Sequence, residues 1–148
     1  MAPGTLALPT LSVGPSSAGP VCSEPGGVLE PPVNAVGMLC DWRGSAALDA
    51  STGMTTEVGH IDYNARVGAF ARLSQMRSGD VIYTRGQAGT QAWIVTRELA
   101  RSKTLPLDAT AFAGPDGPRQ LVLVSCGGNL IPGQRSYADN IYVFAVPA

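Results

Sequence analysis

The sequence predicts an all-β fold, either a barrel or a sandwich, from three observations. Short runs of β-forming residues alternate with breaks made of Gly, Pro, Asp or Ser. Only residues 67–73 and 108–113 suit a helical turn or two. The chain has 148 residues, which is enough for one domain with a core but short for two. We therefore expect one β-rich domain with one or two short helices.

The predicted strands are apolar runs bounded by turn-forming residues. Residues 121–124 do not alternate with polar residues, which is typical of a strand covered on both faces. The full set of predicted strands is 35–39, 55–61, 80–84, 91–98, 119–126 and 141–146.

Residues 1–32 differ in composition from the rest of the chain. They contain seven of the twelve prolines, five glycines and only two charged residues, Glu24 and Glu30. Such a segment buries too little apolar surface to offset its ordering entropy. The sequence therefore predicts a flexible N-terminal stalk or linker over 1–32 and a domain over 33–148.

Charge and hydropathy exclude several functions. Ten basic and eleven acidic residues give a net charge of −1, so nothing favours nucleic acid or an anionic membrane. No apolar run reaches 18 residues, and the N-terminus lacks the basic start of a signal peptide. Two expectations stay open: a cytosolic protein, or an exported one whose anchor segment is absent from this chain.

The three cysteines allow more than one arrangement. Cys22 and Cys40 can form a disulfide in an oxidising compartment, leaving Cys126 as a free thiol, or they can remain unpaired. A zinc site is disfavoured because no C-x2-C pair exists and the ligands are far apart. We expect neither a metal nor a cofactor.

Three side chains suit nucleophilic catalysis at a carbonyl. Cys126 closes an apolar run and is followed by two glycines; His60 is the only histidine, and Arg135 lies nine residues beyond the cysteine. A thiolate attacks, an imidazole transfers the proton, and a guanidinium binds the oxyanion. Each residue also has a simpler interpretation, as a small hydrophobe, a structural histidine or a solvated loop arginine. The order along the chain differs from papain-like proteases, and the caspase motif is absent.

Several segments resemble class F (actinobacterial) sortases. The segments 59–62, 68–73 and 76–80 resemble the middle of that family, and 121–128 resembles its signature strand ending in cysteine. Residues 136–143 resemble the closing strand, with the essential arginine just before it. Ser125 stands where the family more often has threonine.

The resemblance implies an eight-stranded sortase β-barrel and a cysteine transpeptidase. Such an enzyme cleaves an LPXTG-type sorting signal between Thr and Gly, and passes the acyl group to an amine of a cell-wall precursor or pilin. On that pattern Cys126 is the nucleophile, His60 the general acid/base and Arg135 the substrate and oxyanion clamp. Ser125 and Gly127 would support the substrate or oxyanion. Apart from the resemblance, Asp62 lies two residues past the histidine and would orient the imidazole or cap a turn.

The resemblance also implies a location and partners. We expect a monomer at the extracytoplasmic face of a Gram-positive cell membrane, attached by a segment missing from this chain. Its partners would be sorting-signal peptides and an amine acceptor, with no nucleic acid. Two alternatives remain: a cysteine hydrolase that releases the acyl group to water, and an inactive sortase-like barrel that serves as a binding module.

Overall fold

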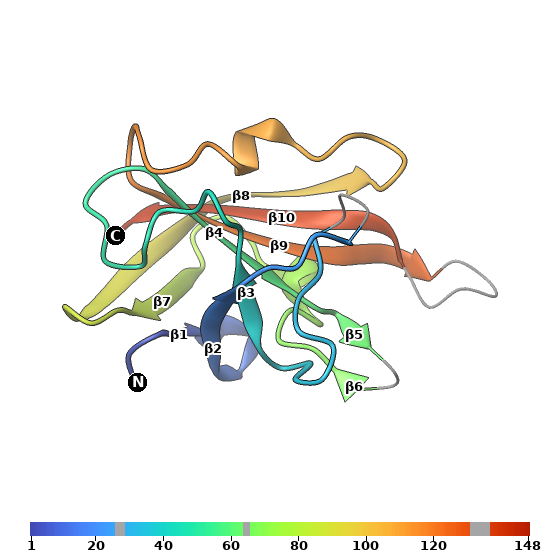
Figure 1. The fold of residues 1–148 in the computed structure, drawn as a ribbon, viewed down its shortest axis with the longest axis horizontal. Coiled ribbons are helices and arrows are strands. Elements are labelled where there is room, and N and C mark those ends of the chain that lie inside the picture. Colours follow the sequence, from blue (N-terminus) through green and yellow to red (C-terminus); the bar gives the residue numbers. More distant parts are fainter. Residues whose placement is uncertain (26–28, 64–65, 131–136) are drawn as a thin grey trace.

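Eight strands close into a barrel in the order β1-β2-β3-β4-β9-β10-β8-β7 (Figure 1). The computed structural model describes residues 1–25, 29–63, 66–130 and 137–148, except the side chains of residues 15, 19, 126–130 and 137. A separate two-stranded sheet, β5-β6, projects at one end of the barrel. The all-β prediction is confirmed, and its barrel form is the correct one of the two alternatives.

The described regular elements are strands of 2 to 13 residues and single 3-10 turns, and no helix among them is long and apolar enough to span a membrane. The strands are β1 (Thr5–Leu8), β2 (Val13–Val21), β3 (Leu39–Asp41), β4 (Met54–Gly59), β5 (Asp62–Tyr63), β6 (Arg66–Val67), β7 (Val81–Arg85), β8 (Thr90–Ser102), β9 (Gln120–Leu130) and β10 (Tyr137–Pro147). The 3-10 helices are η1 (Pro9–Leu11), η3 (Leu73–Gln75) and η4 (Ala109–Ala111).

Five of the predicted strands are confirmed as β4, β7, β8, β9 and β10, and one is wrong. In the predicted strand 35–39, the Met38 N–H donates to the Ala35 carbonyl at 2.9 Å, which is a turn bond. The strand therefore begins only at Leu39. The two predicted helical segments each contain or adjoin one 3-10 turn, and Asp108 caps η4 by accepting a hydrogen bond from the Thr110 N–H.

The N-terminal segment is where structure and sequence-based prediction differ most. Residues 5–8 and 13–21 form β1 and β2, and β1 closes the barrel by pairing with β7. Leu6, Leu8 and Leu11 are buried in the core. The expectation of a flexible stalk is therefore wrong for this segment. Its composition predicted low burial, but neighbouring strands supply both hydrogen-bond partners and apolar surface.

Two apolar clusters cover the two faces of the sheet around β9. Leu121 and Leu123 belong to the cluster inside the barrel, whereas Val122 and Val124 belong to a second cluster on the opposite face. Ala111 of η4 packs into the second cluster. This double burial confirms the prediction from the unbroken apolar run, since adjacent side chains of a strand point to opposite faces.

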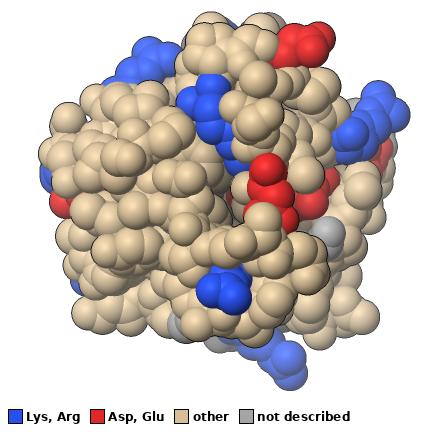
Figure 2. All heavy atoms as spheres, turned by 90° about the vertical axis from the view of Figure 1, so that its left-hand side faces the viewer, with Lys and Arg blue, Asp and Glu red and all other residues tan. Residues whose placement is uncertain are grey.

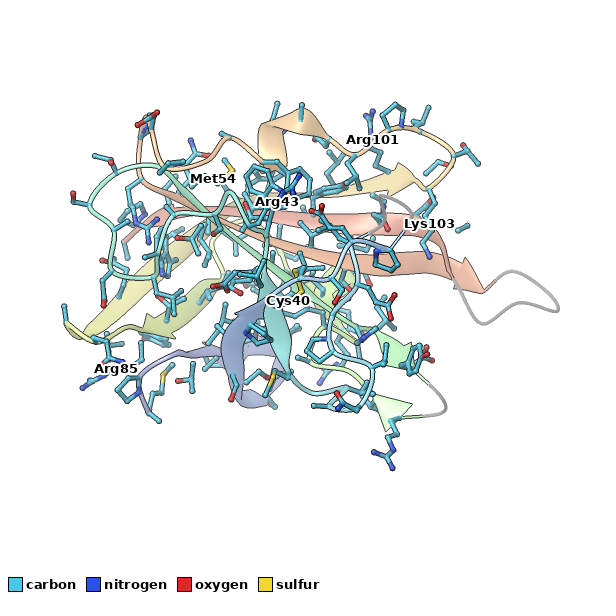
Figure 3. All side chains as sticks on the ribbon, viewed as in Figure 1. Cys40, Arg43, Met54, Arg85, Arg101 and Lys103 are labelled. Atoms are coloured by element: carbon cyan, nitrogen blue, oxygen red, sulfur yellow. A yellow bond between two sulfur atoms is a disulfide. The ribbon has the colours of Figure 1, made fainter. Side chains whose placement is uncertain are left out.

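A disulfide joins Cys22 to Cys40, with an S–S distance of 2.03 Å and a Cα–Cα distance of 4.9 Å (Figure 3). It fastens the two ends of the connection from β2 to β3, two strands that pair in parallel. This settles the pairing that the sequence left open. Since the chain has three cysteines, Cys126 is the remaining thiol.

A pair of carboxyl groups lies in the wall of the barrel. Asp41 on β3 and Glu57 on β4 are register partners, and the Glu57 side chain is fully buried. Burial raises the pKa of Glu57 well above its ordinary value of 4.5, and the neighbouring Asp41 raises it further. As a carboxylate, Glu57 meets no donor among the described residues, whereas as an acid it can donate to Asp41. Folding therefore favours the neutral acid.

We predict that the Cys22→Ala/Cys40→Ala variant loses about 3 kcal/mol of unfolding free energy, because the disulfide closes a loop with a sequence separation of 18. Urea denaturation measures the loss, and thiol titration of the unreduced native protein should find no more than the Cys126 thiol. Two or more reactive thiols, or an unchanged denaturation midpoint, would contradict the disulfide.

We predict that the unfolding free energy falls as pH rises from about 4.5 through the folded-state pKa of Glu57. The sign follows because the folded protein retains a proton that the unfolded chain has released. Glu57→Gln should flatten this slope, whereas Asp116→Asn, at an exposed carboxylate, should not. Urea denaturation at several pH values tests this. Equal slopes in the wild type and Glu57→Gln would contradict it.

Candidate active site

The parallel pairing of β4 with β9 brings two of the candidate residues together. Gly59 and Ser125 are the last register partners of these two strands, and His60 and Cys126 follow them directly. Neighbouring strands lie about 5 Å apart, so the main chains at His60 and Cys126 lie side by side. In Figure 1, β4 and β9 run together toward the end of the barrel that carries β5 and β6.

Cys126 lies within a strand, not at its end. The sequence run stops at Cys126, but β9 continues to Leu130, and Cys126 pairs with Asn140 of β10. The side chain of Cys126 and the whole of Arg135 lie outside the described residues. The proposed meeting of thiol, imidazole and guanidinium therefore stays a prediction, supported by the backbone register for the first two.

The main chain at His60 is held by the segment that follows the β5-β6 hairpin. The Phe70 N–H donates to the His60 carbonyl at 3.0 Å, and the Gly68 N–H donates to the Ile61 carbonyl at 2.7 Å. A Cβ at Gly68 would overlap the His60 carbonyl, so this close approach requires glycine. On the other side, a Cβ at Gly59 would come within 2.7 Å of Phe70.

The imidazole of His60 is half-buried between two groups. Its Nε2 atom lies 3.1 Å from the carbonyl oxygen of Pro31, in the β2–β3 connection. The ring of Tyr63 lies 5.3 Å away between centroids, tilted by 42°. The Tyr63 side chain is 38% exposed, so this contact stands at the protein surface.

The other predicted site residues are Ser125 and Gly127 on β9 and Asp62 on β5. Ser125 is buried and pairs with both Gly59 and Ile141, and Gly127 pairs with Asp139. Asp62 lies exposed on β5. The suggested roles of Ser125, Gly127 and Asp62 remain predictions.

A hollow of about 410 Å³ lies at the opposite end of the barrel, near the C-terminus. Arg119 lines it, but its guanidinium already donates to the carbonyls of Ala47, Leu48 and Gly53 and to the Thr55 hydroxyl. Figure 2 faces this end and shows acidic and basic side chains scattered without a block of one sign. The arginine therefore braces this end of the barrel.

No group of three or more His, Cys, Asp or Glu residues that could hold a metal ion occurs within the described part of the chain. The strand register brings the His60 imidazole to the strand that carries Cys126. That pairing suits acyl transfer through a thioester.

The chain belongs to the sortase family, since the model of the sortase domain matches residues 19–148. No curated protein matches the chain by sequence.

Solved structures share the fold at low sequence identity. Sortase C1 of Streptococcus agalactiae, solved as a complex with MTSET, has a TM-score of 0.74 at 14% identity, covering 98% of this chain and 66% of that one. Sortase C1 of Streptococcus suis has a TM-score of 0.73 at 16% identity, and the match covers 98% of this chain and 72% of that one. Sortase A of Corynebacterium diphtheriae has a TM-score of 0.71 at 21% identity, and the match covers 97% of this chain and 59% of that one. The chain thus spans roughly two thirds of the length of these proteins, and the likeness confirms the eight-stranded sortase barrel.

Sequence reasoning missed two contributors to the environment of His60. Pro31 fell within the predicted stalk of residues 1–32, and nothing in a proline pair reveals which side chain its carbonyl will meet. Tyr63 gave no signal beyond being an aromatic residue near the histidine. Gly68 could have been found, since an isolated glycine between apolar residues often marks close backbone approach.

We predict that Gly68→Ala destabilises the fold by roughly 1–3 kcal/mol, because the methyl group must displace the main chain at His60. Thermal or urea unfolding measures the change. Gly14→Ala is the matched control, since a Cβ there meets nothing within 4 Å. Equal stability of the two variants would refute the close contact.

Proposed function

We propose that this protein is a class F sortase, a cysteine transpeptidase acting on LPXTG-type sorting signals. The observation that supports the proposal is the β4–β9 register, whose last partners, Gly59 and Ser125, directly precede His60 and Cys126, in a chain of the sortase family. The class F assignment rests on the resemblance of residues 59–62, 68–73 and 121–128 to that class.

The first half-reaction forms a thioester and breaks an amide. The Cys126 sulfur, as a thiolate, attacks the Thr carbonyl of the Thr–Gly bond and gives a tetrahedral oxyanion. Arg135 and the backbone N–H groups near Gly127 bind this oxyanion in the proposal, with Ser125 supporting the substrate. The His60 imidazolium donates a proton to the leaving glycine nitrogen, so the new amine departs neutral and the acyl group stays on sulfur.

The second half-reaction transfers the acyl group to an amine. The acceptor nitrogen attacks the thioester carbonyl while neutral His60 removes its proton, and the thiolate leaves. The products are a new amide and the starting thiolate–imidazolium pair. An acceptor from a cell-wall precursor or a pilin fits this step, as the resemblance implies.

The Cys22–Cys40 disulfide supports a location outside the cytoplasm, because such bonds persist in oxidising compartments. We propose the extracytoplasmic face of a Gram-positive (actinobacterial) cell membrane. The proposed form is a monomer. Asp62, two residues beyond His60, is the sequence-based candidate for orienting the imidazole or capping a turn, and the tautomer of His60 tests the first of these roles.

We predict that mass spectrometry of the protein mixed with a Leu-Pro-x-Thr-Gly peptide detects an acyl adduct on Cys126. Cys126→Ala should give no adduct and still fold. His60→Ala should lower kcat/KM by about 10²–10⁴-fold, and Arg135→Ala by about 10²–10³-fold. Asp116→Asn is the control, as an exposed residue.

An added amine then separates the proposal from its alternatives. A transpeptidase makes the new amide, whereas a hydrolase produces only the free acid. A binding module would hold the peptide without any adduct, and that result would refute the catalytic proposal.

A further inference from the structure

A backbone carbonyl lies directly against the only histidine of the chain. The Pro31 oxygen is 3.1 Å from His60 Nε2, and Pro31 is buried. We propose that Pro31 is a positioning residue: its carbonyl holds the His60 ring in the Nε2–H tautomer, so that Nδ1 exchanges the proton. The catalytic part of this inference rests on the proposed function, whereas the tautomer does not.

The chemistry of the contact selects the tautomer. A carbonyl oxygen only accepts hydrogen bonds, so an attractive contact at this distance requires a proton on Nε2. In the neutral ring the other nitrogen, Nδ1, then carries the basic lone pair. In the imidazolium the Nε2–H remains bound to the carbonyl, and the oxygen's partial charge stabilises the positive ring. A reaction cycle then moves only the Nδ1 proton.

The carbonyl is held in place before any substrate binds. Pro31 has a fixed φ, and the following Pro32 confines residue 31 to extended conformations. The Glu30 N–H donates to the Ser23 carbonyl at 2.8 Å, which ties the segment back on itself. The Cys22–Cys40 disulfide fastens the two ends of the same connection. Little entropy is therefore lost when this acceptor meets the ring.

The ring itself is restrained from two further sides. The Phe70 N–H fixes the main chain of His60 through its carbonyl, and the Tyr63 ring lies 5.3 Å from the imidazole. A ring turned by a half-rotation would present carbon to the Pro31 oxygen and lose the hydrogen bond. The three contacts together define one orientation.

Two other interpretations of the surroundings of His60 predict results opposite to those expected from the positioning role of Pro31. If the Asp62 carboxylate oriented the ring by accepting from Nδ1–H, the neutral ring would be the other tautomer. If the Pro31 carbonyl instead blocked the nitrogen that performs proton transfer, loosening the carbonyl would raise the rate. Both are therefore separable from a positioning role by experiment.

The first test is the tautomer of the wild-type protein. With one histidine in the chain, ¹⁵N-histidine labelling yields a single set of ring signals, and long-range ¹H–¹⁵N spectra at alkaline pH show which nitrogen bears the proton. We expect the Nε2–H form to predominate. Predominance of the Nδ1–H form would overturn the proposal, whether or not the protein is a transpeptidase.

The second test loosens the carbonyl. Pro31→Gly/Pro32→Gly should move the ring signals toward a mixture of tautomers and lower kcat roughly 3- to 10-fold with KM unchanged, the effect of one hydrogen bond. Pro25→Ala, in the same connection but exposed, is the matched control and should match the wild type. An unchanged or raised kcat in the double variant would overturn the positioning role. If no peptide is turned over by any variant, the proposed function fails, and the spectra alone decide the tautomer.

Discussion

The parallel pairing of β4 with β9 is the constraint on which the rest of the molecule depends. Six consecutive register partners, from Met54↔Gln120 to Gly59↔Ser125, lock these strands together. A shift of one residue would turn the apolar side chains of β9 to the wrong faces, and both faces are buried. Core packing on both faces of β9 therefore fixes the register that brings the main chain at His60 beside that at Cys126.

Parallel pairing also requires crossover connections, and these connections shape the site. Strands β2 and β3 are parallel, so the chain between them must travel back along the barrel. That connection is fastened by the Cys22–Cys40 disulfide and passes close enough for Pro31 to reach His60. The disulfide thus stabilises the fold and the surroundings of the imidazole through one segment.

Two polar side chains of the barrel, Glu57 and Arg119, have structural roles in the fold. Glu57 is buried beside Asp41, which favours its neutral acid form, and Arg119 donates four hydrogen bonds at the far end of the barrel. The Arg119 guanidinium has its hydrogen-bond partners within the fold, and the Glu57 carboxyl is accommodated as the neutral acid. The exposed aromatic ring of Tyr63 and the half-buried imidazole stand instead at the opposite end, where a peptide could approach.

The sequence by itself determined the all-β class, five strands, the double burial of 121–124 and the candidate residues His60 and Cys126. Those features depend on local composition and on the order of motifs along the chain, and the sequence shows both directly. Only the tertiary structure decided that residues 5–21 complete the barrel, that Cys22 pairs with Cys40, and that Pro31 meets His60. Each of these depends on which distant segment supplies the partner. A Pro/Gly-rich strand is stabilised by its neighbours, and a carbonyl acquires a role only when folding sets a side chain against it.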